Sequence, residues 1–467
     1  MRTVAALLLM LGLAVSACAG DENKDSGSQA LAPVTSLVAT QGDGQLALAW
    51  VNPTFADFAG VTLRRDTSGA PATPTSGVLV YEGTGLGVVD SALANGVRYY
   101  YSAFAHDAAG SYAAGTLADG VPNPASPVQL AFAGVGGGGG DHGIFDPSLA
   151  LDPASGRIWM AYSEVIDSPQ WPGQNRFIST RIGWSDDQGA SWADQGVINP
   201  AQDVTIPLAP PNNAGTWVNE TPSLVYDAAA PANERWKLMW MRYLLVNGVR
   251  HFEHGWMGIK TAPDPAGSWS AERKLFVGSL YDTSNNVIIG PPEVQLDQLH
   301  PDLNAMLVAA EPGLLADASG LYVTLYAAEG LATNGRLALL RLPVGQTTWQ
   351  YRGSLLVNAT DGPLLGFDGY SAPALFEKAG QRFLVATPEN GDYYLGAQVF
   401  AVNSLSNAAL QRASGTPVVT FSHAGTAGSF NGAAAYIPQA TASGLLYSEA
   451  VVTSVVEFRI YASRRNP

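Results

Sequence analysis

Several carboxylates recur at one repeated place in this chain. Asp146 and Glu311 each directly precede proline in x-Pro-x-Leu segments, and Glu220 lies one residue ahead of a third such segment. Asp368 lies shortly before a fourth. Carboxylates that meet in one pocket raise the pKa of at least one member, which suits a general acid working beside a base. The pattern therefore predicts Asp146, Glu311, Glu220 and Asp368 as candidate catalytic residues.

Four further side chains near these segments are candidate ligand contacts. They are His142 beside a glycine run, Trp217, Arg242 and Tyr370. Aromatic rings can stack on a ligand, although core packing is the usual place of a tryptophan or tyrosine. The chain predicts no metal site and no cofactor. In the His-x-x-His segment, His251 and His254 would point to opposite faces of a strand.

The elements that must position these groups are strands. A repeat begins at Asp141, and each copy pairs an x-Pro-x-Leu segment with an aromatic-rich strand; the copies are 146–149, 221–224, 311–314, 372–375 and a degenerate 432–435. Repeats of about 60 to 90 residues built from four strands predict a β-propeller. We therefore expect an all-β chain, with a five-bladed propeller over 141–467 whose central funnel gathers the candidate residues.

A second unit precedes the repeat. Residues 34–121 alternate apolar and polar positions in short runs separated by turns, which predicts a small sandwich. A proline- and glycine-rich linker is expected over 122–140. Within it, the run Gly134 to Gly139 matches G-x-G-x-x-G, but no helix follows and no nucleotide site is predicted.

The N-terminus predicts export. Residues 1–17 combine a basic start with a short apolar core, and Val15-Ser16-Ala17-Cys18 closes that core. The polar stretch up to residue 33 reads as a flexible tether. A net charge of −15 argues against nucleic acid as a partner. With Cys18 as its single cysteine, the chain holds together without disulfides.

Three local motifs resemble known families. The tetrad ending at Cys18 resembles the bacterial lipobox, which implies a lipidated Cys18 anchored to the cell envelope, and Ala19 favours the outer membrane. Trp50 and the Leu93–Tyr99 segment resemble the core tryptophan and tyrosine corner of fibronectin type III domains, which serve as spacers or as platforms for protein partners. Residues 185–192 resemble the Asp-box of sialidases, a structural turn of propeller blades.

The repeat with its carboxylates resembles the five-bladed glycosidases that include arabinanases, xylosidases and invertases. The resemblance implies a carbohydrate ligand, with Asp146 ionised as base or nucleophile and Glu311 as proton donor. Ala372 departs from it, because blade four lacks a carboxylate there, and Glu220 is one residue out of register. Six-bladed sialidases fit less well, since no spacing groups the arginines. Two hypotheses stay open: a glycoside hydrolase, or a non-catalytic propeller that binds a glycan or protein.

Overall fold

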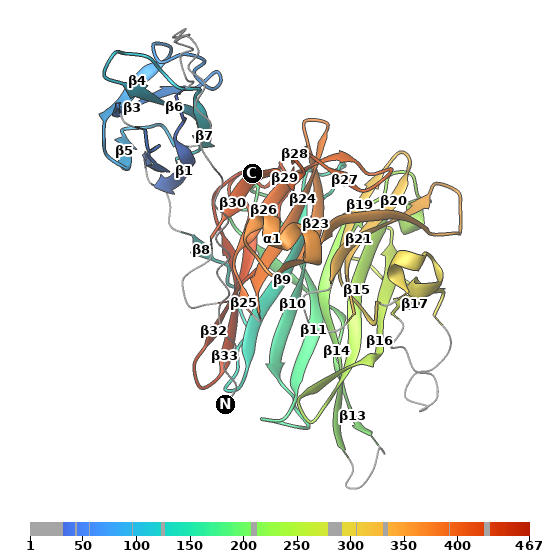
Figure 1. Cartoon of the computed structure of the whole chain (residues 1–467). Coiled ribbons are helices and arrows are strands. Elements are labelled where there is room, and N and C mark those ends of the chain that lie inside the picture. The colour runs from blue at the N-terminus through green and yellow to red at the C-terminus, as the bar shows by residue number, and fades with distance from the viewer. Residues whose placement is uncertain are drawn as a thin grey trace, which may run out of the picture. The chain divides into compact units, whose positions relative to one another are not determined.

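The computed structural model describes residues 31–467 except 43, 56, 96, 123–126, 207–212, 279–291, 305, 330–334, 392 and 425–429. The predicted signal peptide, Cys18 and most of the predicted tether lie outside these residues. The chain divides into two compact units, Met1–Pro122 and Asn123–Pro467. Both are built from strands (Figure 1), and none of the described helices has the length and apolar character needed to cross a membrane.

The first unit consists of two antiparallel sheets. One has the order β1 (Thr35–Gly42), β2 (Gln45–Val51), β5 (Gly87–Ser91), and the other has the order β4 (Val78–Gly83), β3 (Phe58–Asp66), β6 (Tyr99–Asp107), β7 (Thr116–Gly120). One apolar cluster with side chains from both sheets fills the space between them. Trp50 is buried in this cluster, and the Tyr99 hydroxyl accepts a hydrogen bond from Ala94 N at 3.0 Å.

The described strands of the second unit form five mainly antiparallel blades, of which the first and the last share one eight-stranded sheet through a parallel pair of strands; their bounds are as follows. Blade one runs β9 (His142–Leu151), β10 (Ile158–Asp167), β11 (Arg176–Ser185), β12 (Ala193–Asn199). Blade two runs β14 (Asn213–Tyr226), β15 (Trp236–Val246), β16 (Val249–Ala262), β17 (Arg273–Val277), with β13 (Gln202–Ile206) beside β14 and β18 (Val294–Gln295) beside β17. Blade three runs β19 (Val308–Asp317), β20 (Gly320–Ala328), β21 (Arg336–Pro343), β22 (Gln350–Val357).

Blade four runs β23 (Gly369–Lys378), β24 (Gln381–Asn390), β26 (Ala397–Ser404), with β27 (Ala409–Leu410) and β30 (Val419–His423) both beside β26. Blade five runs β31 (Phe430–Ala435), β32 (Leu446–Val452), β33 (Val456–Ala462), β8 (Val128–Gln129). The remaining elements are short: α1 (Asn358–Leu365), η1 (Ala232–Glu234), η2 (Leu296–Gln298), η3 (Pro301–Leu303), β25 (Tyr393–Tyr394), β28 (Arg412–Ala413) and β29 (Thr416–Pro417).

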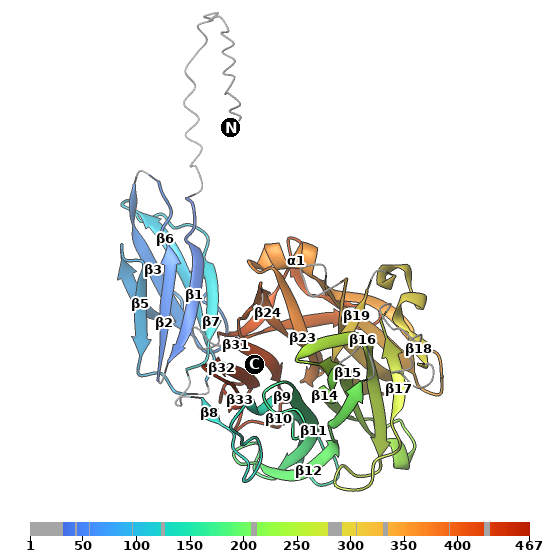
Figure 2. The same cartoon turned by 90° about the horizontal axis from the view of Figure 1, so that it is seen from below.

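The inner strands form a ring. Each of β9, β14, β19, β23 and β31 contacts the next, and β31 contacts β9 again, so the blades surround one axis as a five-bladed propeller (Figure 2). The two chain ends of this unit close it, because β33 pairs in parallel with β9 and antiparallel with β8. The predicted linker 122–140 is therefore partly wrong: β8 belongs to blade five, and Leu130 and Phe132 are buried in the core.

Every inner strand carries the same bulge. Among the described inner-strand residues other than glycine, five have positive φ, one in each blade: Asp146 (53°), Thr221 (52°), Glu311 (54°), Ala372 (44°) and Ala433 (45°). The pairing register of each inner strand with its neighbour shifts at this point. In the fifth copy, the repeat position is thus Ala433 rather than Gly432. A bulge places two residues opposite one and re-aims side chains, which is how each blade turns this segment toward the axis.

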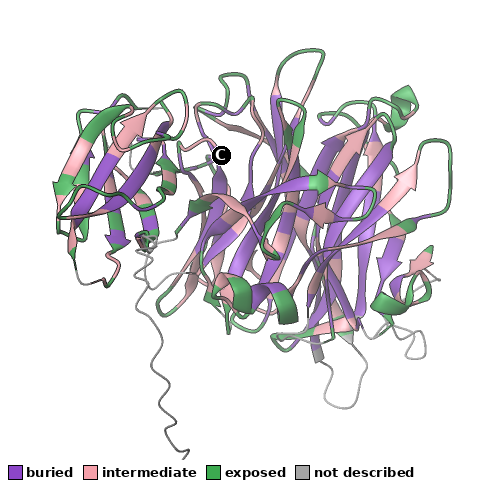
Figure 3. Ribbon diagram, turned by 45° about the horizontal axis from the view of Figure 1, so that its top comes forward, coloured by how far each residue is buried: buried purple, intermediate pink, exposed green. Residues whose placement is uncertain are grey.

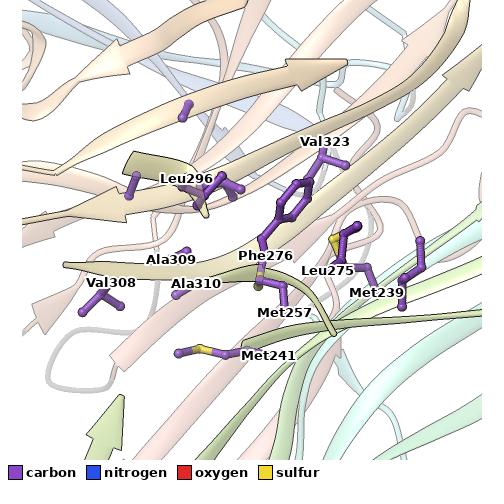
Figure 4. Packing of buried hydrophobic residues seen from close by; sticks show 14 of the residues in the cluster. Met239, Met241, Met257, Leu275, Phe276, Leu296, Val308, Ala309, Ala310 and Val323 are labelled. Carbon is purple, nitrogen blue, oxygen red and sulfur yellow. The ribbon is translucent and has the colours of Figure 1, made fainter. Parts of the chain in front are cut away.

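Apolar packing holds the blades together. The largest cluster joins blades two and three through Met239, Met257, Phe276, Ala310 and Val323 (Figure 4). Buried residues concentrate along the strands, while the connecting loops are largely exposed (Figure 3). This distribution makes the strands a rigid frame for the residues at the axis.

The turn between β11 and β12 is held by an aspartate. Asp187 accepts hydrogen bonds from Ser191 N at 2.9 Å and from the Ser185 and Ser191 hydroxyls. Gly189 has φ of +89°, and the Trp192 indole donates to its carbonyl. The turn fixes the outer hairpin of blade one, far in sequence from the bulge at Asp146.

Candidate active site

A cavity of about 520 Å³ opens at the axis of the second unit, and all five blades line it. Its charged and polar lining is Asp146, Arg176, Glu220, Thr221, Arg250, Glu311, Tyr326, Ser371, Glu389, Tyr394, Ser448 and Glu449. Apolar side chains, including Phe145, Phe252, Phe430 and Phe458, make up most of the remainder. A much smaller space of about 40 Å³ is lined by the bulges themselves. Polar groups set in apolar walls are the usual composition of a ligand site.

Asp146 reaches the cavity from the bulge of β9. Its Oδ2 accepts hydrogen bonds from Ser163 Oγ and Thr221 N, both at 3.2 Å. Burial raises the pKa of Asp146 well above its usual range, and the negative charges of Glu220 and Glu311 raise it further. Asp146 therefore holds a proton more readily than an ordinary aspartate, and it must release that proton before it can act as the ionised base or nucleophile that the resemblance implies.

Glu220 also lines the cavity, although it precedes the repeat position, which is Thr221. The register shift between Glu220 and Ser223 breaks the simple alternation that would turn it away. The Tyr243 hydroxyl donates to Glu220 Oε1 at 2.8 Å. The structure thus brings together carboxylates from blades one, two and three.

Glu311 reaches the cavity from the bulge of β19. Its Oε2 accepts a hydrogen bond from Ala372 N in blade four at 2.7 Å, and the Tyr394 hydroxyl donates to Oε1 at 3.4 Å. Burial raises the pKa of Glu311 to about 7, and the charge of Glu220 adds to the effect. A carboxyl group with this pKa can hold and release a proton near neutral pH.

Blade four supplies an acid that the sequence pattern missed. Glu389 lines the cavity from the second strand, β24, rather than from the inner strand where Ala372 stands. Burial raises its pKa to about 7, with the charge of Glu311 as the next cause. Only an alignment of the second strands of all blades would have pointed to it, since Glu389 occupies the place that Tyr243 holds in blade two.

Two arginines accompany the acids. Arg250 lines the cavity from β16, and its charge lies close enough to Glu220, Glu311, Tyr243 and Tyr394 to interact with each. Arg176 lines it from β11, with its Nε bonded to Asp141 Oδ2 at 2.7 Å. No spacing in the sequence grouped these two with the acids, because they come from outer parts of different blades.

Three predicted residues lie outside the cavity. Asp368 is exposed in the turn before β23, where its Oδ2 accepts from Gly391 N at 2.8 Å. Tyr370 is fully buried against Phe400, because strand alternation turns it away from the face that Ser371 presents. His142 is half-buried, with its Nδ1 2.8 Å from the Gly140 carbonyl oxygen.

Trp217 and Arg242 also lie elsewhere. Trp217 packs in a separate apolar cluster with Trp256, their ring centroids 5.3 Å apart. The Arg242 guanidinium lies 5.5 Å from both ring centroids and 3.6 Å from Glu272. Trp217 and Glu220 are three residues apart on β14, and this odd spacing places their side chains on opposite faces of the strand.

Within the described part of the chain, no group of three or more His, Cys, Asp or Glu side chains is arranged to hold a metal ion. The expected divergence of His251 and His254 is nevertheless wrong. Their rings lie 6.1 Å apart and nearly parallel, because the register of β15 and β16 shifts at this point.

No family model and no curated protein matches the chain. Solved structures with a similar arrangement include the native arabinanase of Bacillus subtilis, at 11% identity over 69% of this chain and 95% of that one, with a TM-score of 0.39. A family 117 glycoside hydrolase of Zobellia galactanivorans matches at 13% identity over 73% and 90%, with a TM-score of 0.42. A Hadza microbial sialidase matches at 10% identity over 90% and 93%, with a TM-score of 0.39. Since all three scores are below 0.5, the fold assignment rests on the strand pairing described above.

Proposed function

We propose that the second unit is a glycan-active propeller that hydrolyses glycosidic bonds in its central cavity. One observation carries the proposal: carboxylates from three separate blades, Asp146, Glu220 and Glu311, meet in one cavity with apolar walls. Burying several like charges together lowers the stability of the fold, so a purely structural role does not explain the arrangement. Glycoside hydrolysis uses such a group of acids, one to donate a proton and one to act as base or nucleophile.

In this proposal Glu311 protonates the leaving oxygen, because burial and Glu220 hold its pKa near 7. Asp146 on the opposite part of the ring acts as base or nucleophile. It acts in its ionised form, so its proton must first pass to solvent through the cavity. The carboxylate that remains then stabilises the positive charge that develops on the sugar in the transition state. A carboxyl separation of about 5–5.5 Å would give retention, and about 6.5–9.5 Å inversion.

The test is a panel of glycans incubated with the purified protein, with product analysis, followed by Glu311→Gln. The glutamine keeps an oxygen to accept from Ala372 N, so folding should survive while turnover falls on the order of a thousandfold. Loss of the Glu311 proton should lower the activity of the unaltered protein as pH rises through about 7, and protonation of Asp146, whose pKa is also raised, should lower it as pH falls. Asp368→Asn, outside the cavity, is the matched control. Turnover of Glu311→Gln within about threefold of the unaltered protein would rule this assignment out.

A non-catalytic glycan-binding propeller is the second candidate, and one observation favours it. Both acids hold neighbouring blades together, since Asp146 accepts from Thr221 N and Glu311 accepts from Ala372 N. A binding protein would retain glycans without releasing products, and Glu311→Gln would then leave its glycan affinity within a few fold.

We further propose that the protein is exported and anchored to the cell envelope through lipidated Cys18, with the first unit as a fibronectin-like spacer. The lipobox-like tetrad supports the anchor. The buried Trp50 and the Tyr99 hydroxyl bonded to Ala94 N support the spacer.

A further inference from the structure

We propose that Ser371 and Glu389 of blade four form a polar subsite in the cavity that binds a pair of hydroxyl groups on a saccharide ligand. This inference rests on the proposed function and names the part of the ligand that blade four would hold. The two residues stand on adjacent strands, β23 and β24, and both line the cavity.

The geometry brings the two side chains to one face. Ser371 pairs with Thr387, and Gly369 pairs with Glu389, so Glu389 lies two residues along β24 on the same side as Thr387. Ser371 stands directly before the bulge residue Ala372, at the place that Glu220 holds in blade two. Blade four therefore presents a hydroxyl where blade two presents a carboxylate, and it adds a carboxyl group from the next strand.

A hydroxyl group without a well-formed hydrogen bond points to a ligand here. Ser371 is only 2% exposed, and its Oγ makes no well-formed hydrogen bond within the described part of the chain, although it lies close enough to the Glu389 carboxyl group to favour that group's ionised form. A buried polar group without a partner costs free energy, so such a group in a cavity is best explained by a partner that arrives from outside. A serine hydroxyl can donate one hydrogen bond and accept others, which matches a sugar hydroxyl.

Glu389 supplies the complementary acceptor. An ionised carboxylate accepts hydrogen bonds on both oxygens and can hold two neighbouring hydroxyls at once. Its pKa near 7, raised by burial and by Glu311, also allows the protonated form to donate near neutral pH. Tyr394 is already bonded to Glu311, so it does not compete for this place.

The experiment measures binding of plain sugars to the purified protein. D-galactose and L-arabinose, which carry neighbouring cis hydroxyls, and their deoxy analogues would be titrated by NMR against the unaltered protein, Ser371→Ala and Glu389→Gln. Each variant should weaken binding about tenfold, because Ser371→Ala removes a hydrogen bond to a sugar hydroxyl and Glu389→Gln replaces one charged acceptor oxygen by a donor; the deoxy analogues should lose a similar factor. Glu377→Gln, at the exposed outer end of β23, is the matched control and should bind as the unaltered protein does.

Four outcomes overturn the inference, and they separate it from the proposed function. If the unaltered protein binds sugars but both variants bind within twofold of it, the subsite is absent while the glycan function stands. A Glu389→Gln variant that shifts only the pH profile of activity acts through Glu311, which also rejects the subsite. No binding of any sugar or glycan to the unaltered protein would end both proposals. If Glu389→Gln fails to fold, Ser371→Ala alone decides, and normal sugar affinity in that variant rejects the subsite.

Discussion

At the residue scale, the cavity contains buried carboxyl groups that hold their protons near neutral pH. Glu311 and Glu389 both have a pKa raised to about 7, mainly by burial. The charge of Glu220 also raises the pKa of Glu311, and the charge of Glu311 also raises the pKa of Glu389. Arg250 carries a positive charge close to Glu220 and Glu311. A site that keeps carboxyl groups protonated near neutral pH is prepared for proton transfer, but it lowers the stability of the unliganded fold whenever those groups ionise.

Stability should therefore fall with rising pH. Below about pH 4.5 both acids are protonated in the folded and unfolded states, so their full contribution to the free energy of unfolding is present. As pH rises from there toward 7, the unfolded chain ionises first and the contribution is lost. Each unit of pKa difference is worth about 1.4 kcal/mol before it is reduced for solvent screening. Urea unfolding between pH 5 and 8 measures this loss, and Glu389→Gln should make the pH dependence shallower.

The control for that measurement is Asp368→Asn, which removes an exposed carboxylate outside the cavity. It should keep the pH dependence of the unaltered protein. A flat stability profile between pH 5 and 8 in the unaltered protein would contradict the raised pKa values of both glutamates.

At the element scale, the seam between blades one and five decides whether the ring stays closed. Gly143 pairs with Phe458 across the parallel β9–β33 contact and has φ of +125°. A Cβ at this glycine would lie 1.9 Å from the Phe458 carbonyl oxygen. Backbone meets backbone here, so no side-chain rotation can relieve the clash.

Gly143→Ala is expected to lower the free energy of unfolding by about 3 kcal/mol or more, from steric overlap added to backbone strain. Gly156→Ala is the matched control. Gly156 also has positive φ, at +76°, but a Cβ there would meet nothing within 4 Å. The control should lose only about 1–2 kcal/mol. Equal losses in the two variants, measured by chemical unfolding, would show that the seam is not a tight contact.

At the scale of the whole molecule, the second unit should fold by itself if it keeps its first strand. A fragment beginning at Asn123 retains β8 and the buried Phe132, whose ring stacks on Tyr162 at 5.0 Å. It should show one cooperative thermal transition. A fragment beginning at Asp141 loses these contacts and should be less stable by roughly 3 kcal/mol or more, the cost of removing a buried aromatic side chain.

Calorimetry of the two fragments measures the difference. Equal melting temperatures would mean that 123–140 is only a linker, as the sequence pattern alone suggested. Absence of a cooperative transition in the longer fragment would place the boundary of the unit elsewhere.

Attachment to the envelope is a prediction about the whole molecule that depends on one thiol. Cys18→Ser removes the sulfur that lipidation needs, so the variant should move from the membrane fraction to the soluble fraction of disrupted cells. Ser16→Thr, inside the same tetrad, is a mild control that leaves the thiol in place. Unchanged membrane partitioning of Cys18→Ser would contradict the anchor.

The sequence by itself determined the repeat, and with it the all-β blades and the location of Asp146 and Glu311. Both acids stand inside the repeated segment, so the periodicity that marks a blade also marks its residues at the axis. Only the tertiary structure decided which further side chains line the cavity. Glu220 faces inward only because a bulge changes the alternation of β14, and Glu389 enters from a second strand.

The same limit explains the residues that the sequence misplaced. Tyr370 and Trp217 lie near the repeated segments, yet their strands turn them into apolar clusters. The strand β8 lies in a segment that looks like a linker, and its partner β33 is more than 300 residues away in the chain, so no local pattern could reveal the pairing. Local periodicity encodes which segments become strands, whereas bulges and long-range pairing decide which side chains meet at the axis.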